Sequence, residues 1–408
     1  YAQLLINASR QISDEIAFVI AASSIGNVPE PMVILKNAEA LYRNDQFVEY
    51  ADIIDVDNGD NDYYSTIMYR TLEEAIEKEV ILPKDIYYWY VVHPEISSEK
   101  ADEVYGAIWR DYLLNHNDIR YPLLKEKIAG IKYLWDGKAY HSPGGRLWNV
   151  SITEHPTAIE AIGYWIGKTV PYGAMGSRPG QPQKIAHEHN GWCGELQRLA
   201  VAAQRTLLVP SVAACNVAED HVWREFYERG WHQNDNWWYD GGGTVDIPYV
   251  YSDGWGKNMS SIYGWRGDDA IYEQTARYIH SDDRVTISFK VRDLFLQPID
   301  GARVTALVTG IKDITWYKSE IWDLIQQIWD RIPTLLKGNL LQQLFDRIQT
   351  RFEEIPDIID GVTISVWNYT DATGTCTLTL GKNLDYVFLI QSGNLRRAWQ
   401  FARHNTLR

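Results

Sequence analysis

The stretch from His187 to Trp238 decides the fold, and it reads HEHNGWCGELQRLAVAAQRTLLVPSVAACNVAEDHVWREFYERGWHQNDNWW. Residues 194–207 carry leucine and alanine on one helix face, and the small alanines let this helix pack closely on a sheet. Pro210 ends the helix. Segments rich in β-branched and aromatic residues follow, and they predict strands at 211–217, 221–227 and 231–239. The stretch therefore predicts one helix packed on an antiparallel sheet.

Cys193 stands at the predicted start of this helix, shortly after Gly191. A free thiol has a pKa of about 8.5 and is mostly protonated at neutral pH. A helix N-terminus and a neighbouring imidazolium both favour the thiolate, which is the nucleophilic form. The alternative is a buried structural cysteine. The setting Gly-x-Cys-Gly and the residues that follow favour a nucleophile.

His221 is the candidate base for this thiol, and Asp235 is its candidate partner. If residues 221–226 pair with 230–235 around a three-residue loop, these two side chains lie directly opposite on one face of the sheet. The carboxylate would then fix the imidazole tautomer and stabilise the imidazolium. A register shifted by one residue would present Asn234 instead. Asparagine can also orient a histidine, so Asn234 is the alternative orienter.

An oxyanion formed at Cys193 needs hydrogen-bond donors. The backbone N–H of Cys193 is one candidate. The second donor is open among three side chains: Trp165, Tyr164 and His187.

Metal binding is the weaker interpretation of these residues. Four side chains offer zinc ligands: His187, His189, Cys193 and His221. The chain lacks C-x-x-C and H-E-x-x-H spacings, however. The acidic segment 55–62 also departs from a calcium loop, because Gly59 occupies the fifth loop position and Thr66 the twelfth. We expect no metal and no cofactor.

The central residues resemble the transglutaminase-like superfamily of papain-type thiol enzymes. The matching motifs are Gly191-Trp192-Cys193-Gly194-Glu195, the segment DHVWREFY at 220–227 and the segment GWHQND at 230–235. The resemblance covers about residues 155–245 and departs from the family where Leu208-Val209 replaces the usual Gly-Ile before a proline. It implies a papain-like core with Cys193 as nucleophile, His221 as base and Asp235 as orienter.

The amino-acid composition indicates which classes of partner the chain is not expected to bind. The net charge of −15 repels phosphate backbones, so nucleic acid is not expected as a partner. The apolar run Ile16 to Ala22 is far shorter than the ~20 residues that span a bilayer. The aromatic residues are 17 Trp and 26 Tyr against 9 Phe, which suits either a rigid core and surface or contacts with peptide and glycan.

The length of 408 residues predicts more than one domain. We expect an α+β protein with an α-rich N-terminal region at 1–150, which has a structural or lid role. The Gly/Pro-rich segment 141–148 reads as a linker to a transglutaminase-like core at 151–280. Alternating segments then predict a β-sandwich at 281–408, with a helical-hairpin insertion at about 316–357.

The C-terminal β region resembles a carboxypeptidase regulatory-like module of immunoglobulin type. The cues are the segment PIDGARV at 298–304 and the segment TDATG at 370–374. The helical insertion departs from that pattern. Because such modules are usually adhesive or structural, the resemblance implies a surface or filament partner.

The predicted location is extracellular or at the cell surface. The chain opens at Tyr1 without an initiator methionine, which indicates a processed or truncated chain with any signal peptide already lost. Three cysteines cannot make a disulfide framework, and pairing of Cys215 with Cys376 has no support in the sequence. Four sequons add to the extracellular interpretation: Asn7, Asn149, Asn258 and Asn368.

The predicted function is thiol-dependent acyl transfer on a peptide or carboxamide substrate through a cysteine thioester. Transfer to water would make the chain a protease or amidase, and transfer to an amine would make it a crosslinking transglutaminase. We favour hydrolysis. The alternative is a non-catalytic extracellular surface or assembly protein that retains the fold, although such a protein need not keep the set Cys193, His221 and Asp235.

Overall fold

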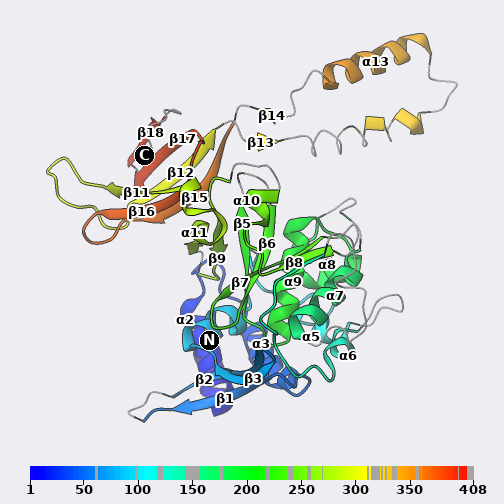
Figure 1. Ribbon diagram of the computed structural model, residues 1–408, viewed down its shortest axis with the longest axis vertical. Helices are drawn as coiled ribbons and strands as arrows, with labels where there is room; N and C mark the ends of the chain where they lie inside the picture. The colour runs from blue at the N-terminus through cyan, green and yellow to red at the C-terminus, as the bar shows by residue number, and fades with distance from the viewer. Residues whose placement is uncertain are drawn as a thin grey trace. The chain divides into compact units, whose positions relative to one another are not determined.

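The computed structural model describes residues 1–401 except 60–62, 98, 117–122, 143–156, 172, 174–177, 217, 219–220, 238–241, 255–258, 269, 310–311, 314–321, 323–324, 327–328, 333–337, 354–357, 360 and 394. The chain forms two compact units (Figure 1). The first unit comprises residues 1–215, 221–250 and 263–274, and the second comprises 216–220, 251–262 and 275–408. The division at 150/151 and 280/281 stays a prediction.

The N-terminal part of the first unit combines helices with a sheet. Its helical elements are α1 (Ala2–Asn7), η1 (Arg10–Ile12), α2 (Ser13–Ala22), α3 (Pro31–Asp45), α4 (Lys84–Tyr87), η2 (Tyr88–Val92), α5 (Trp109–Asn115) and α6 (Leu124–Ile128). Between α3 and α4 lies an antiparallel sheet of β1 (Ala51–Asp57), β2 (Tyr63–Glu73) and β3 (Ile76–Ile81). The prediction of an α-rich region at 1–150 does not include this sheet, and the tyrosine, threonine and isoleucine of β2 favour a strand.

Helix α9 (Cys193–Thr206) is the central helix of the first unit. It contacts α5, α7 (Ala158–Thr169), α8 (Pro182–Glu188) and strand β6 (His221–Tyr227) (Figure 1). Its apolar face is fully buried, and Leu196, Leu199, Ala200 and Ala203 are all 0% exposed. Small side chains at this face permit the close packing that the sequence predicts.

The predicted hairpin belongs to the main antiparallel sheet. In the part of the chain that the structure describes, the strand order is β10-β9-β5-β6-β7-β8-β4. The strands are β4 (Tyr140–Ser142), β5 (Ser211–Asn216), β6 (His221–Tyr227), β7 (Trp231–Trp237), β8 (Gly242–Val245), β9 (Tyr263–Trp265) and β10 (Ile271–Glu273). Because α9 contacts both β6 and β7, the predicted α+β class is confirmed.

One continuous core joins the N-terminal part to α9, since a single cluster of buried side chains runs from Ile12 to Val245. Two buried arginines reinforce this connection. Arg110 donates hydrogen bonds to the backbone oxygens of Val91 and Arg205. Burial lowers the pKa of both arginines to about 9, so both remain charged at neutral pH.

Arg205 bonds to the segment that follows η2. Its Nη1 donates to the oxygens of His93 at 2.9 Å and Glu95 at 3.1 Å, and its Nε donates to the oxygen of Ser211 at 2.9 Å. Residues 91–95 are thereby fixed against the C-terminal end of α9. The N-terminal part supports the helix that carries Cys193.

Among its described residues, the second unit contains two larger antiparallel sheets, beside the two-residue pairing of Lys312–Asp313 with Ile358–Ile359. One has the order β15-β12-β17-β18 and the other is β11-β16. Their bounds are β11 (Arg284–Lys290), β12 (Arg303–Thr309), β15 (Val362–Tyr369), β16 (Thr375–Gly381), β17 (Tyr386–Ser392) and β18 (Leu395–Phe401). The rings of Phe289 and Phe388, one from each sheet, are 4.8 Å apart, as expected in a β-sandwich.

The remaining elements of the second unit are short except for one helix. They are α10 (Val250–Gly254), whose first residue belongs to the first unit, α11 (Thr275–Tyr278), η3 (Ser281–Asp283), β13 (Lys312–Asp313), α13 (Asn339–Glu353) and β14 (Ile358–Ile359). Phe345 of α13 stacks on Trp329 at 4.2 Å. Most of the first arm of the predicted helical hairpin lies outside the described residues. Within the described ranges, no helix is long and apolar enough to cross a bilayer.

Candidate active site

Cys193 is the first residue of α9 and is partly exposed. The local sequence fixes this helix start. Glu195 Oε2 accepts a hydrogen bond from the backbone N–H of Trp192 at 2.9 Å, and Arg178 Nη2 donates to the same oxygen at 2.7 Å. Gly191 is required here, because a Cβ at this position would lie 2.5 Å from Glu195 Cβ. The thiol therefore stands at the N-terminus of a long, buried helix.

His221 and Asp235 form a buried pair. His221 Nε2 lies 3.1 Å from Asp235 Oδ2, and the two residues are 8% and 0% exposed. This bond leaves Nδ1 as the ring nitrogen for Cys193. The structure thus brings together the three side chains that the sequence analysis selected.

The strand register behind this pair differs from the predicted one. Strands β6 and β7 pair with Arg224 opposite Asn234 and Tyr227 opposite Trp231, a shift of two residues from the expected register. His221 and Asp235 are therefore diagonal neighbours and not directly opposite. An even shift keeps both side chains on the same face, so the contact survives.

The charge on His221 follows from its surroundings. Burial by itself would lower the pKa of His221, because it penalises the imidazolium. Hydrogen bonds with Asp235 and Cys193, together with Coulombic interactions with both side chains, outweigh burial and raise the pKa to about 9. The ring is therefore protonated at neutral pH. An imidazolium beside a thiol favours the thiolate, so the pair is suited to nucleophilic attack.

Two residues near Asp235 were missed by sequence reasoning. Asp235 Oδ1 accepts hydrogen bonds from Gln197 Nε2 at 2.7 Å and from the backbone N–H of Asn236 at 2.8 Å. Gln197 lies on α9 one turn after Cys193. Its spacing of four residues from Cys193 places the two side chains on one face of the helix, but this spacing alone does not distinguish it from the other polar residues of α9.

Asn234, the alternative orienter, has different neighbours. Its Oδ1 accepts from Gln204 Nε2 at 3.4 Å, and its Nδ2 donates to the Thr244 oxygen at 3.3 Å. These contacts involve the far end of α9 and strand β8. They favour Asp235 as the residue that orients His221.

The three oxyanion candidates lie in α7 and α8. His187 Nδ1 lies 3.2 Å from the hydroxyl of Tyr112. Lys127 lies over the ring of Tyr164 at 5.2 Å, and Trp165 is 1% exposed in the core. The second oxyanion donor stays a prediction.

The geometry of the described side chains does not support the metal-binding interpretations. Among the described side chains, no group of three or more His, Cys, Asp or Glu could hold a metal ion. His189 Nδ1 instead donates to the Thr169 oxygen at 2.7 Å. In the acidic segment, Asp57 Oδ1 accepts from the Gly59 N–H at 3.0 Å, and residues 60–62 lie outside the described residues.

All three cysteines are free thiols. Burial raises the pKa of Cys215 to about 12, with a further Coulombic contribution from Cys193, and burial raises the pKa of Cys376 to about 11. Both thiols are therefore protonated and poorly nucleophilic at neutral pH. Cys193 is the cysteine suited to chemistry.

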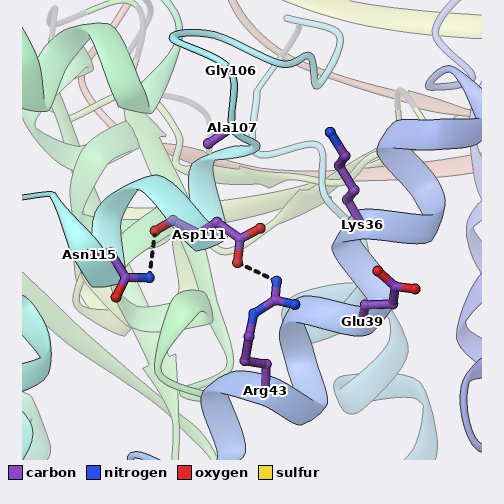
Figure 2. A pocket seen from close by; sticks show the side chains of 7 residues that line it. All are labelled: Lys36, Glu39, Arg43, Gly106, Ala107, Asp111 and Asn115. Carbon is purple, nitrogen blue, oxygen red and sulfur yellow. Dashed lines mark hydrogen bonds and ion pairs between the residues drawn. The ribbon is translucent and has the colours of Figure 1, made fainter.

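A hollow of about 380 Å³ lies between α3 and α5 (Figure 2). It is lined by Lys36, Glu39, Arg43, Gly106, Ala107, Asp111 and Asn115. Its cations already have partners, because Lys36 pairs with Glu103 at 2.8 Å and Arg43 pairs with Asp111. None of the three candidate catalytic side chains lines this hollow, so it is not the active site.

Part of this chain is similar to curated proteins, whereas no family model matches it. A peptide-N(4)-(N-acetyl-beta-glucosaminyl)asparagine amidase of Yarrowia lipolytica is 33% identical over 108 residues, 25% of this chain and 28% of that protein. An amidase of the same name from Candida glabrata is 30% identical over 155 residues, 37% of this chain and 42% of that protein. One from Debaryomyces hansenii is 31% identical over 112 residues, 26% of this chain and 28% of that protein. The chain thus spans less than half the length of each relative.

These relatives correct the predicted location. An extracellular or cell-surface protein is the wrong interpretation, because the relatives are cytosolic amidases. The four sequons count only as support for an extracellular location, so with this correction they no longer support a prediction. Asn7 and Asn368 are exposed, and Asn149 and Asn258 lie outside the described residues. No relative supports the immunoglobulin-type module or its surface or filament partner, whereas all three support the transglutaminase-like superfamily.

Proposed function

We propose that this chain is a thiol amidase that hydrolyses a carboxamide through a thioester on Cys193. The observation that carries the proposal is the bond of 3.1 Å between His221 Nε2 and Asp235 Oδ2, in a histidine that also bonds to Cys193. A thiol at a helix N-terminus, paired with an oriented imidazolium, is the arrangement that activates a cysteine for acyl transfer.

The reaction has two halves. Cys193 Sγ attacks the amide carbon, and a C–S bond forms while the carbonyl oxygen becomes negative. The C–N bond then breaks, and the imidazolium of His221 gives its proton to the leaving amine. In the second half, neutral His221 takes a proton from water, which attacks the thioester. The C–S bond breaks, and the thiolate and a carboxylic acid are released.

The remaining side chains have positioning roles in this scheme. Asp235 keeps the proton of His221 on Nε2 and so leaves Nδ1 to serve Cys193 and the leaving amine. The backbone N–H of Cys193 is the first donor to the oxyanion. The second donor is one of Trp165, Tyr164 and His187.

The proposed substrate is a glycopeptide. The relatives' name describes an amidase for asparagine that carries N-acetylglucosamine on its side-chain amide. Hydrolysis of that amide would convert the asparagine to aspartate and release the sugar as an amine. This name describes neither a protease nor a crosslinking enzyme, so hydrolysis of a side-chain amide is favoured over both.

The proposal is tested with a peptide that carries one N-linked glycan, incubated in heavy-oxygen water. We expect an aspartate with one heavy oxygen at the former glycosylation site, detected by mass spectrometry. Cys193→Ala should abolish the product, and Cys215→Ser is the matched control that should retain it. Iodoacetamide should alkylate Cys193 faster than Cys215.

Two results would contradict the proposal in different ways. An unchanged glycopeptide with rapid alkylation of Cys193 would exclude this substrate and leave a thiol enzyme for another amide. Alkylation of Cys193 as slow as that of Cys215 would favour the non-catalytic alternative.

A further inference from the structure

Both oxygens of Asp235 are engaged. Oδ2 faces His221 at 3.1 Å, and Oδ1 accepts from Gln197 Nε2 at 2.7 Å and from the Asn236 N–H at 2.8 Å. The carboxylate is fully buried. A carboxylate held at both oxygens has a fixed plane, so the direction of its bond to His221 is also fixed.

The amide of Gln197 is itself held by Arg224. Arg224 Nη1 donates to Gln197 Oε1 at 2.8 Å, and Nη2 donates to Asn236 Oδ1 at 2.6 Å. Gln197 and Arg224 are both 0% exposed. Because a guanidinium has only donors, it selects the amide oxygen of Gln197 and directs the amide NH₂ toward Asp235. The orientation of the glutamine thus follows from the arginine.

This arrangement places a neutral amide between two charges. A guanidinium bonded directly to Asp235 would compete with His221 for the carboxylate. The amide of Gln197 separates them, and it presents a donor polarised by Arg224 while Oδ2 stays available for the ring. The elements involved are α9, β6 and β7, so the network also fixes the thiol helix relative to the hairpin.

We propose that Gln197 and Arg224 are positioning residues that extend the set Cys193, His221 and Asp235. The proposal rests on the proposed function, since positioning matters only if these three residues react with substrate. Gln197 holds the plane of the carboxylate, and Arg224 holds the plane of the amide. Neither side chain is placed against the substrate.

The test compares Gln197→Met with Gln204→Met. Gln204 lies on the same helix, is equally buried, and also has both amide groups bonded, to Asn234 at 3.4 Å and Ser211 at 2.5 Å. It has no place in the Asp235 network. We expect Gln197→Met to lower kcat on the glycopeptide by about 10–100-fold with KM little changed, which is typical of lost support behind a reactive group. Gln204→Met should lower thermal stability without that loss of kcat.

Arg224 provides the conservative comparison. Arg224→Lys keeps a cationic donor for Gln197 and should retain most of the activity, whereas Arg224→Met should lose as much as Gln197→Met. The double variant with methionine at both positions should be no worse than either single one, because the two residues act as a unit.

The results that would overturn this positioning role differ from those that would overturn the proposed function. Equal losses of kcat in Gln197→Met and Gln204→Met would show a merely structural role. Alkylation of Cys193 and the downfield N–H resonance of His221 need no substrate. If the wild type leaves the glycopeptide intact but Gln197→Met slows alkylation and shifts that resonance while Gln204→Met does neither, the positioning role stands and the substrate is wrong. If neither readout changes in Gln197→Met, the positioning role is wrong.

Discussion

At the scale of single residues, the pH behaviour of His221 follows from its raised pKa. The folded-state pKa of about 9 lies above the ordinary value of about 6.5. The stabilisation from the imidazolium is therefore complete below about pH 6.5 and is lost as the pH rises through about 9. Relative to His221→Gln, the wild type should lose up to about 3 kcal/mol of unfolding free energy between about pH 6 and pH 10.

Urea unfolding of both proteins at a series of pH values measures this difference. Parallel curves across the whole range would mean that His221 gains no favourable partner on folding. Activity on the glycopeptide should also decline above about pH 9, because the proton for the leaving amine is lost there.

Asp235 can be compared at the same scale with an aspartate of a more exposed histidine–aspartate pair. A second histidine–aspartate pair, His232 with Asp246, has the same sequence separation, and its Nδ1 and Oδ1 atoms are 3.0 Å apart. Asp235→Asn should lower kcat by about 10³–10⁴-fold, because an amide no longer fixes the tautomer of His221. Asp246→Asn should leave kcat within about threefold. Similar losses in both variants would contradict the assigned role of Asp235.

At the scale of elements, Arg205 is one of the residues that attach α9 to the N-terminal part. Arg205→Met would leave the oxygens of His93, Glu95 and Ser211 without this donor. We expect a loss of about 3 kcal/mol of unfolding free energy, because buried carbonyl groups then lack a partner. Arg198→Met on the same helix removes only a part-buried bond to the Gly180 oxygen and should cost about 1 kcal/mol or less. Denaturant midpoints of the two variants test the difference.

The hairpin shows how far an element can be predicted from sequence. Its strands and its three-residue loop follow from the alternating pattern, but the register does not. The left-handed residue of the loop is Arg229, with φ of 56°, and not the neighbouring Gly230. Arg229 is held there by a bond of 3.1 Å to Glu73 and one of 3.0 Å from its N–H to the Tyr69 hydroxyl. Because these partners come from β2, local sequence could not reveal the register.

The roles of Gln197 and Arg224 could not be predicted from the sequence for a related reason. Each looks like an ordinary polar residue on its own element. Their roles depend on how α9 lies against β6 and β7, and that placement is set by the packed core. By contrast, the start of α9 at Cys193 could be predicted, because glycine, a capping acid and an apolar face all lie within one segment.

At the scale of the whole molecule, the two units are not consecutive segments of chain. Residues 251–262 belong to the second unit although they precede part of the first. Within the second unit, Ser260 accepts from the Gly381 N–H at 2.8 Å and bonds to the Ser365 hydroxyl at 2.7 Å. If the chain were divided at residue 280, as the sequence predicts, Ser260 would be separated from both Gly381 and Ser365.

A chain that ends at residue 280 should therefore unfold at a lower urea concentration than the full chain. The reason is that Ser260 loses its partners Gly381 and Ser365, and Ser261 loses its partner Ser365. Tryptophan fluorescence measures the midpoints of both chains. Equal midpoints would instead support the predicted boundary as a point where the chain can be divided.

The contacts at the C-terminal end of α9 also bear on the order in which parts of the first unit can pack while the chain is being synthesised. Arg205 bonds to the oxygen of His93 across 112 positions, and Asn44 bonds to the oxygen of Thr206 across 162. Local contacts form early, whereas contacts between distant segments wait for long loops to close. Residues 1–95 would leave the ribosome long before α9 exists, with the surfaces that receive it still uncovered. The surfaces of residues 1–95 that receive α9 are thus open to chaperones until at least residue 210 has emerged.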